Sequence, residues 1–114
     1  MTNSQLEKIA NTWQKRLRLQ NWNIKITFED NLSGTAIGEC DPHCEFLDAK
    51  VRIRANLPES EIELTVIHEL LHLRFPHVNP GWHDMFQVHQ LIGNEFETGI
   101  EMIARALQDA YKKK

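Results

Sequence analysis

The chain has 114 residues, of which 41% are hydrophobic and 25% charged, and its formal net charge is −3. This length predicts one domain over residues 1–114 with a single modest core. The negative charge, with basic residues clustered only at Lys112–Lys114, argues against a nucleic-acid surface as the main function. No apolar run reaches transmembrane length and the first residues show no signal-peptide pattern, so we expect a cytoplasmic protein without a membrane partner.

The first third of the chain changes from helical to strand spacing. Ser4-Gln5-Leu6-Glu7 has the pattern of a capping box and predicts a helix that continues to about Leu19. The residues expected on its buried face are Leu6, Ile9, Ala10, Trp13 and Leu17. Alternation of apolar and polar residues over 22–28 then predicts a half-buried strand, and residues 35–40 and 49–55 predict a second and a third strand.

Cys40 and Cys44 are the only two cysteines, and they stand on either side of His43 in a segment expected to form a loop. Two thiols and an imidazole could form part of a zinc site or a short-loop disulfide. A structural zinc site normally has four ligands, however, and an intracellular chain disfavours a disulfide. We therefore interpret both residues as reduced thiols at a turn, with a second metal or redox role as the alternative.

A helical pattern with two histidines follows the third strand. Apolar residues recur at helical spacing over residues 59–75, Pro58 suits the first turn of a helix, and Pro76 ends it. Inside this run, His68-Glu69-Leu70-Leu71-His72 puts two histidines at i and i+4 on one face, where both can ligate one Zn²⁺. Glu69 would then lie beside the open coordination position. The alternative is a core helix with two coincidental histidines, but buried histidines need partners and this interpretation does not explain Glu69.

The C-terminal part predicts two further helices. A short helix over residues 85–92 is expected to end at Gly93-Asn94, and a longer one runs from Glu95 to Tyr111. The residues expected on the inner face of the longer helix are Ile100, Ile103, Ala104, Leu107 and Tyr111. The order of one helix, three strands and then helices predicts an α+β fold, in which a small, mostly antiparallel three-stranded sheet packs against helices.

A catalytic zinc ion normally has a third protein ligand, and Glu97 is the favoured candidate. Glu97 and Glu101 are four residues apart on one helix face, so one could bind the metal while the other holds a ligating histidine in place. Glu97 could instead form a capping box with Asn94. Glu101 could itself be the ligand, or it could be a solvated residue paired with Arg105.

A downstream histidine is the other kind of candidate for this ligand. His83 is the second choice, although it could instead be a residue at a helix start beside an Asp N-cap. His77 and His89 are weaker candidates. His77 lies one residue short of the H-E-x-x-H-x-x-G-x-x-H spacing, and Phe75 occupies the glycine position of that pattern.

The sequence resembles the minigluzincins and the short H-E-x-x-H metallopeptidases found in phage and prophage genomes. The resemblance covers most of the chain, and it is carried by residues 19–24, 49–53, 66–73, 96–101 and 104–107. Gluzincins take their third ligand from a Glu on a later helix, often with an acidic residue four positions on that braces a zinc-binding histidine. The resemblance therefore implies these roles for Glu97 and Glu101, with Glu at the second position in place of the more usual Asp.

A second family shares part of the pattern. SprT-like zincins take a third histidine from a segment resembling His-Gly-x-x-Phe, and His83-Asp84-Met85-Phe86 is similar, with Asp in place of Gly. These proteins often act on or near DNA. We rank this family second because the sequence has neither a basic face nor a Cys-rich zinc module.

We therefore expect a minimal zinc-dependent metallopeptidase with a peptide or protein substrate. Its Zn²⁺ would be held by His68, His72 and Glu97, and Glu69 would deprotonate a water molecule on the metal. The second predicted strand could pair with an extended substrate. The alternative is a non-catalytic zinc-binding interaction domain, which would have no need of a general base such as Glu69.

Overall fold

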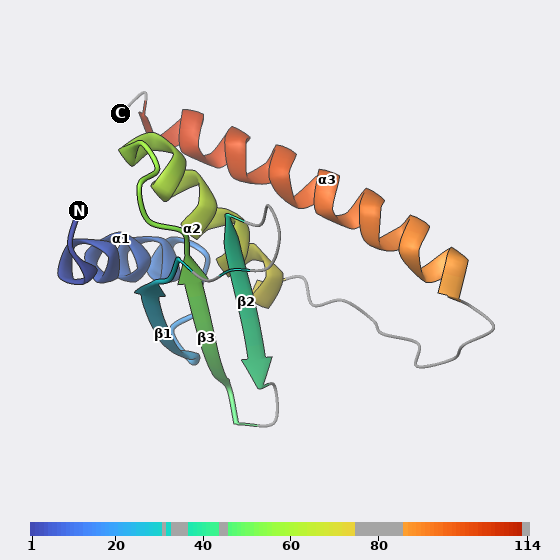
Figure 1. Ribbon diagram of the computed structural model, residues 1–114, viewed down its shortest axis with the longest axis horizontal. Coiled ribbons are helices and arrows are strands. Elements are labelled where there is room, and N and C mark those ends of the chain that lie inside the picture. The colour runs from blue at the N-terminus through green and yellow to red at the C-terminus, as the bar shows by residue number, and fades with distance from the viewer. Residues whose placement is uncertain (31, 33–36, 44–45, 75–85, 113–114) are drawn as a thin grey trace.

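The computed structural model describes residues 1–30, 32, 37–43, 46–74 and 86–112, and over residues 86–96 it describes the backbone alone. The elements are, in chain order, α1 (Asn3–Arg16), β1 (Asn23–Phe28), β2 (Gly38–His43), β3 (Asp48–Ile53), α2 (Glu59–Arg74) and α3 (Phe86–Lys112) (Figure 1). The predicted α+β class and the order of helix, three strands and helix are thus confirmed. Within the described residues, no helix is both long and apolar enough to span a membrane.

The three strands form one mixed sheet in the order β1-β3-β2. β2 and β3 are antiparallel, whereas β1 and β3 are parallel, so the sheet is mixed rather than mostly antiparallel. The sequence predicted the strands from alternation, which does not specify their neighbours. β3 lies in the middle of the sheet, between β1 and β2. This order leaves β2 at an edge of the sheet.

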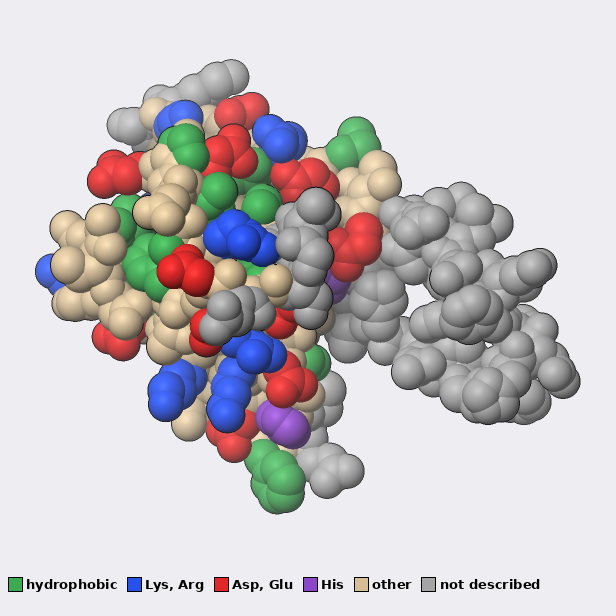
Figure 2. Space-filling model, viewed as in Figure 1, with side chains coloured by type: hydrophobic (Ala, Val, Ile, Leu, Met, Phe, Trp, Pro, Cys, Tyr) green, Lys and Arg blue, Asp and Glu red, His purple; other side chains and the backbone are tan. Residues whose placement is uncertain are grey.

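α1 and α2 cover one face of the sheet, and the other face carries charged side chains. Ala49, Val51 and Ile53 of β3 are at most 3% exposed and point toward the helices. The residues between them, Lys50 and Arg52, point the other way, as the period of two in a strand requires. Figure 2 shows Lys and Arg side chains interspersed with Asp and Glu on the face in view. One such pair joins Arg52 Nη2 of β3 to a carboxylate oxygen of Glu39 of β2 at 3.5 Å.

The capping box of α1 begins at Thr2, two residues before the predicted Ser4. The side chain of Thr2 accepts a hydrogen bond from the N–H of Gln5 at 3.2 Å, and the N–H of Thr2 donates to Gln5 Oε1 at 2.8 Å. Thr-x-x-Gln satisfies the same pattern as the Ser4–Glu7 pair, so the prediction placed the cap on the wrong pair. The helix ends at Arg16 rather than near Leu19, because Arg18 adopts a left-handed backbone conformation with φ of 59°.

α2 is the central helix and contacts α1, α3, β2 and β3. The carbonyl of Pro58 accepts hydrogen bonds from the N–H groups of Glu61 and Ile62, both at 2.9 Å, so the predicted start of this helix is confirmed. The core around it contains side chains from all three helices and from β1 and β3; the most deeply buried include Leu6, Trp13, Val51, Ile53, Ile67 and Leu70.

α3 is one helix, whereas the sequence predicted two helices separated at Gly93-Asn94. A single glycine costs a helix only about 1 kcal/mol, so it does not necessarily break one. The inner face also differs from the prediction. Ile103, which was predicted on the inner face, is 41% exposed. Gln108, which was not, is only 8% exposed. Ile100 and Ala104 are buried as predicted, and Leu107 and Tyr111 are half-buried.

β2 lies three residues later in the chain than predicted. The prediction covered residues 35–40 and assigned the following residues, including Pro42, to a loop. The strand instead runs through Pro42 to His43. Proline is tolerated in an edge strand, where its missing N–H need not face a neighbouring strand. Residues 35 and 36 lie outside the described part of the chain.

Candidate metal centre

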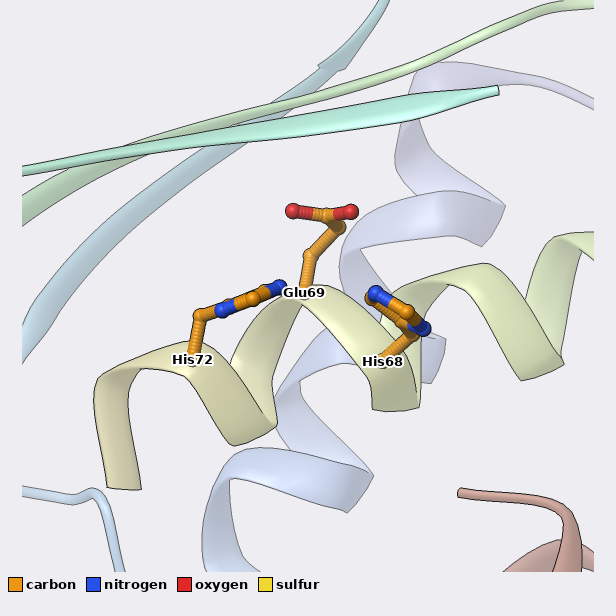
Figure 3. Close-up of side chains that lie close together, drawn as sticks. All are labelled: His68, Glu69 and His72. Atoms are coloured by element: carbon orange, nitrogen blue, oxygen red, sulfur yellow. The ribbon is translucent and has the colours of Figure 1, made fainter. Parts of the chain in front are cut away.

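α2 projects two histidines from adjacent turns on one side and a glutamate on another. His68 and His72 lie four residues apart and their ring centroids are 5.2 Å apart. Figure 3 shows the two rings side by side and the Glu69 side chain extending toward the sheet. The potential ligand atoms of these three residues all lie within 4.8 Å of one another. The predicted helical geometry of the H-E-x-x-H motif is therefore present.

α3 contributes a carboxylate to both histidines. Oε2 of Glu97 lies 2.9 Å from Nε2 of His68, and Oε1 of Glu97 lies 3.0 Å from Nε2 of His72. The Nε2 atoms of the two histidines thus both lie against one carboxylate group. This brings together the three residues that the sequence suggested as metal ligands, from two helices that are distant in the sequence.

Two donor separations among His68, His72 and Glu97 are close to those around a tetrahedral zinc ion. Zn–N and Zn–O bonds of about 2.0–2.2 Å place neighbouring tetrahedral donors roughly 3.3 Å apart. The N···O distances of 2.9 and 3.0 Å are close to this value. Two imidazoles and one carboxylate are also a usual ligand set of catalytic zinc, in which the fourth position is left open. Glu69 would remain beside this position.

Glu101, one turn after Glu97 on α3, contacts the other nitrogen of the His68 ring. Its Oε2 lies 2.6 Å from His68 Nδ1, and its Oε1 lies 3.1 Å from Nε of Arg105. The bracing contact and the pairing with Arg105 were alternatives in the sequence, yet both are present, because the two carboxylate oxygens face different partners. A carboxylate on Nδ1 orients the ring and directs the lone pair of Nε2 toward the site.

The carboxylates around His68 favour its protonated form in the metal-free protein. Burial alone would lower the pKa of His68, but the hydrogen bond to Glu101 and the charges of Glu69 and Glu97 outweigh it, so the pKa is raised above 6.5. A proton on Nε2 would occupy the lone pair that a metal needs. Metal binding is therefore expected to compete with protonation of this ring.

Glu69 is buried between α2 and the sheet, with 7% of its surface exposed. Burial raises the pKa of Glu69 from 4.5 to about 7; the charge of His68 opposes this shift, and the nearby carboxylates of Glu97, Glu39 and Glu101 add to it. This pKa applies to the metal-free protein, and a cation bound nearby would lower it by favouring the charged carboxylate. The position of Glu69 beside the two histidines is what the role of general base, predicted from the sequence, requires.

A cleft of about 820 Å³ runs over the site. It lies between β2 and α2, and the site residues of α3 also line it. Cys40 of β2 is among the lining residues. Cys40 lies in a strand rather than at the predicted turn. Cys44, its predicted neighbour at the turn, lies outside the described residues.

Gly38, at the start of β2, is the site residue that sequence reasoning missed. An added Cβ at this position would lie 3.2 Å from Cγ and Oε1 of Glu69. The strand backbone therefore reaches the general-base candidate directly. The one sequence signal was a glycine inside the strand predicted over residues 35–40, which can mark a close backbone approach.

The structure describes none of the side chains of the downstream histidines that were alternative candidates for the third ligand. His83 and His77 lie outside the described residues, and the side chain of His89 is likewise not described. No protein-family model, no curated protein and no solved structure matches the chain.

Proposed function

We propose that the protein is a zinc-dependent peptidase with Zn²⁺ held by His68, His72 and Glu97. The observation that carries the proposal is the convergence of both histidine Nε2 atoms on the Glu97 carboxylate, at 2.9 and 3.0 Å. Glu69, buried beside this group, supplies the fourth element of a hydrolytic site. A purely structural zinc site has no use for a buried carboxylate next to three ligands, and this favours an enzyme over a non-catalytic zinc-binding domain.

Each residue has a distinct role in the proposed reaction. When bound, Zn²⁺ would polarise the substrate carbonyl and lower the pKa of a water molecule. A carboxylate oxygen of Glu69 accepts a proton from the attacking water and passes it to the leaving nitrogen. Glu101 keeps the His68 ring in its orientation through the contact to Nδ1.

The position of β2 supports a peptide substrate. β2 is an edge strand and lines the same cleft as His68, Glu69 and His72. An extended peptide lying in this cleft would run alongside the strand, and strand addition is a common way for proteins to hold peptides. Peptides and unfolded protein segments are therefore the proposed substrates. The cytoplasmic location stays a prediction from the sequence.

The test compares wild type with Glu69→Gln, each prepared with zinc and assayed on denatured, fluorescein-labelled casein. The substitution keeps the shape of the side chain but removes its ability to accept a proton. We expect about one zinc per chain in both proteins and a loss of turnover of at least about 100-fold in the variant. Equal cleavage by the two proteins would refute the role of Glu69, and a zinc-free wild type after reconstitution would refute the metal site.

A further inference from the structure

Gly38 is the first residue of β2 and lies opposite Ile53 of β3 in the antiparallel register. Ile53 is fully buried and points toward the helices. Because directly opposite residues share a face of the sheet, position 38 also faces the helices. The helix that it meets is α2, at Thr65 and Glu69.

The space in front of Gly38 is already filled. A Cβ at this position would lie 2.6 Å from Cγ2 of Thr65 and 3.2 Å from both Cγ and Oε1 of Glu69. Thr65 is 3% exposed, and its hydroxyl donates to the carbonyl of Glu61 at 2.7 Å, so its rotamer is held by a hydrogen bond. A side chain at position 38 would therefore displace the strand, Thr65 or Glu69.

We infer that Gly38 is a positioning residue for Glu69, an inference that rests on the proposed peptidase function. Its lack of a side chain lets the backbone of β2 lie against the Glu69 side chain and close one side of the space around the carboxylate. Glu69 is thereby confined between the strand and its own helix, with its oxygens near the histidines. A general base must be held close to the proton that it accepts, and small displacements of such a group are costly.

Gly38→Ala is the first test, and Gly99→Ala is its matched control. An added Cβ at Gly99 in α3 would meet no atom within 4 Å, so this control makes the same chemical change in open space. For Gly38→Ala we expect zinc bound at the wild-type stoichiometry, a melting temperature lower by roughly 5–10 °C and a kcat for casein lower by about tenfold or more. KM should change little. Gly99→Ala should keep the wild-type kcat and should not lower the melting temperature.

A double variant separates packing from positioning. Gly38→Ala with Thr65→Ser removes Cγ2, the atom closest to the new Cβ, and retains the hydroxyl that donates to Glu61. The two 3.2 Å contacts to Glu69 remain. We therefore expect this double variant to regain the melting temperature of Thr65→Ser alone, while its kcat stays about tenfold lower than that of Thr65→Ser. It also keeps the inference testable if Gly38→Ala alone does not fold.

Binding of acetohydroxamate to the zinc-loaded proteins gives a readout that needs no turnover. This ligand chelates zinc through two oxygens and can hydrogen-bond to the neighbouring carboxylate, so its affinity should follow the position of Glu69. We expect about tenfold weaker binding to the double variant than to Thr65→Ser. Wild-type kcat and wild-type hydroxamate affinity in the double variant would overturn the positioning role of Gly38.

The outcomes distinguish this inference from the proposed function. Wild type that holds zinc but leaves casein intact would overturn the peptidase proposal, while hydroxamate affinity would still report on Gly38. Wild type that cleaves casein, with a double variant equal to Thr65→Ser, would overturn only the role of Gly38. Wild type without zinc would overturn both.

Discussion

Glu97 makes contact with both histidines of the motif through separate oxygen atoms. In the metal-free protein this carboxylate is hydrogen-bonded to His68 and forms an ion pair with His72. With a metal present, the same carboxylate would be a ligand together with His68 and His72. A single side chain would thus organise the site before metal binding and complete it afterwards.

Glu97→Ala should lose most of its zinc, because removal of a direct ligand costs more than the roughly 10–100-fold typical of an outer hydrogen-bond partner. His83→Ala, prepared identically, is the control and should keep about one zinc per chain. Zinc affinity is measured by competition with a chromogenic chelator. Loss of zinc in His83→Ala alone would instead indicate a histidine-ligated site of the SprT-like kind.

Glu101 orients His68 through Nδ1, and Arg105 holds the second oxygen of Glu101. Glu101→Gln should weaken zinc binding by roughly 10–100-fold, because a neutral amide is a weaker acceptor for the Nδ1 proton. Arg105→Ala should have a smaller effect, since its 60% exposed side chain forms a surface ion pair. The same chelator competition applies. An affinity for Glu101→Gln equal to wild type would show that the ring needs no bracing.

The residues of the site differ in how far the sequence could predict them. His68, Glu69 and His72 are fixed by spacing within one helix, so local pattern was sufficient. Glu97 was selected on its spacing to Glu101 and on a family resemblance, and its distance to the histidines required the packing of α3 on α2. Gly38 could not be selected, because its importance comes from an approach of strand to helix that no local pattern records.

At the scale of elements, α2 and α3 pack antiparallel, and the pairing is visible at two places. Toward one end, Gln108 Nε2 donates to the carbonyl of Ser60 at 2.8 Å and to Glu63 Oε1 at 3.2 Å. Toward the other end lie the contacts of Glu101 and Glu97 with the two histidines. Gln108 is eleven residues from Glu97, which is about three helical turns, so both project from nearly the same face. The register set at Gln108 therefore also aligns Glu97.

Gln108→Ala should lower the unfolding free energy by roughly 1–3 kcal/mol, because it removes two partly buried hydrogen bonds, one to the carbonyl of Ser60 and one to Oε1 of Glu63. It should also weaken zinc binding although it touches no ligand. The neighbouring exposed residue offers a control, Asp109→Ala, which should change neither quantity. Urea unfolding of the metal-free proteins and chelator competition are the measurements. Unchanged zinc affinity in a destabilised Gln108→Ala would show that the site does not depend on this end of the helix pair.

Elements were predicted well where the periodicity of apolar residues was strong, and poorly where packing between distant parts of the chain determined the structure. The strand at residues 23–28 and the helix from Glu59 to Arg74 followed from alternation and helical spacing. The break expected at Gly93-Asn94 did not occur, since glycine weakens a helix without ending it. The parallel pairing of β1 with β3 could not be foreseen either, because alternation along a strand does not encode its neighbour.

At the scale of the whole molecule, the site contains a concentration of groups whose protonation is linked to folding. The pKa of Glu69 is about 7 in the folded metal-free protein, against 4.5 as its ordinary value. Stability from this group is therefore fully present below pH 4.5 and is lost as the pH rises through about 7. The raised pKa of His68 acts in the same direction, with stability present below 6.5 and lost as the pH rises through its folded value.

The metal-free protein should thus become less stable between pH 5 and pH 8, with Glu69 accounting for roughly 2–3 kcal/mol of the change. Metal-free Glu69→Gln lacks this titration, so it should be more stable than wild type at pH 8 and show a shallower pH dependence. The measurement is urea unfolding at several pH values with a chelator present. Zinc should reverse the trend, because its affinity rises as the histidines lose their protons. Parallel pH profiles for the two metal-free proteins would contradict the burial of a titrating Glu69.

Pro42 gives the exposed edge of the sheet a built-in limit to self-association. The N–H of Arg54 donates to the carbonyl of Ile37 at 2.8 Å, which sets the alternation along β2 and turns the backbone of position 42 away from β3. A proline there has no N–H to offer an incoming strand. Any incoming strand, from a peptide or from a second copy of the chain, would therefore lack a hydrogen bond of the ladder at this position. This interruption near the end of β2 opposes long edge-to-edge pairing, the first step toward fibrils and amorphous aggregates, while a short peptide could still pair with the residues before Pro42.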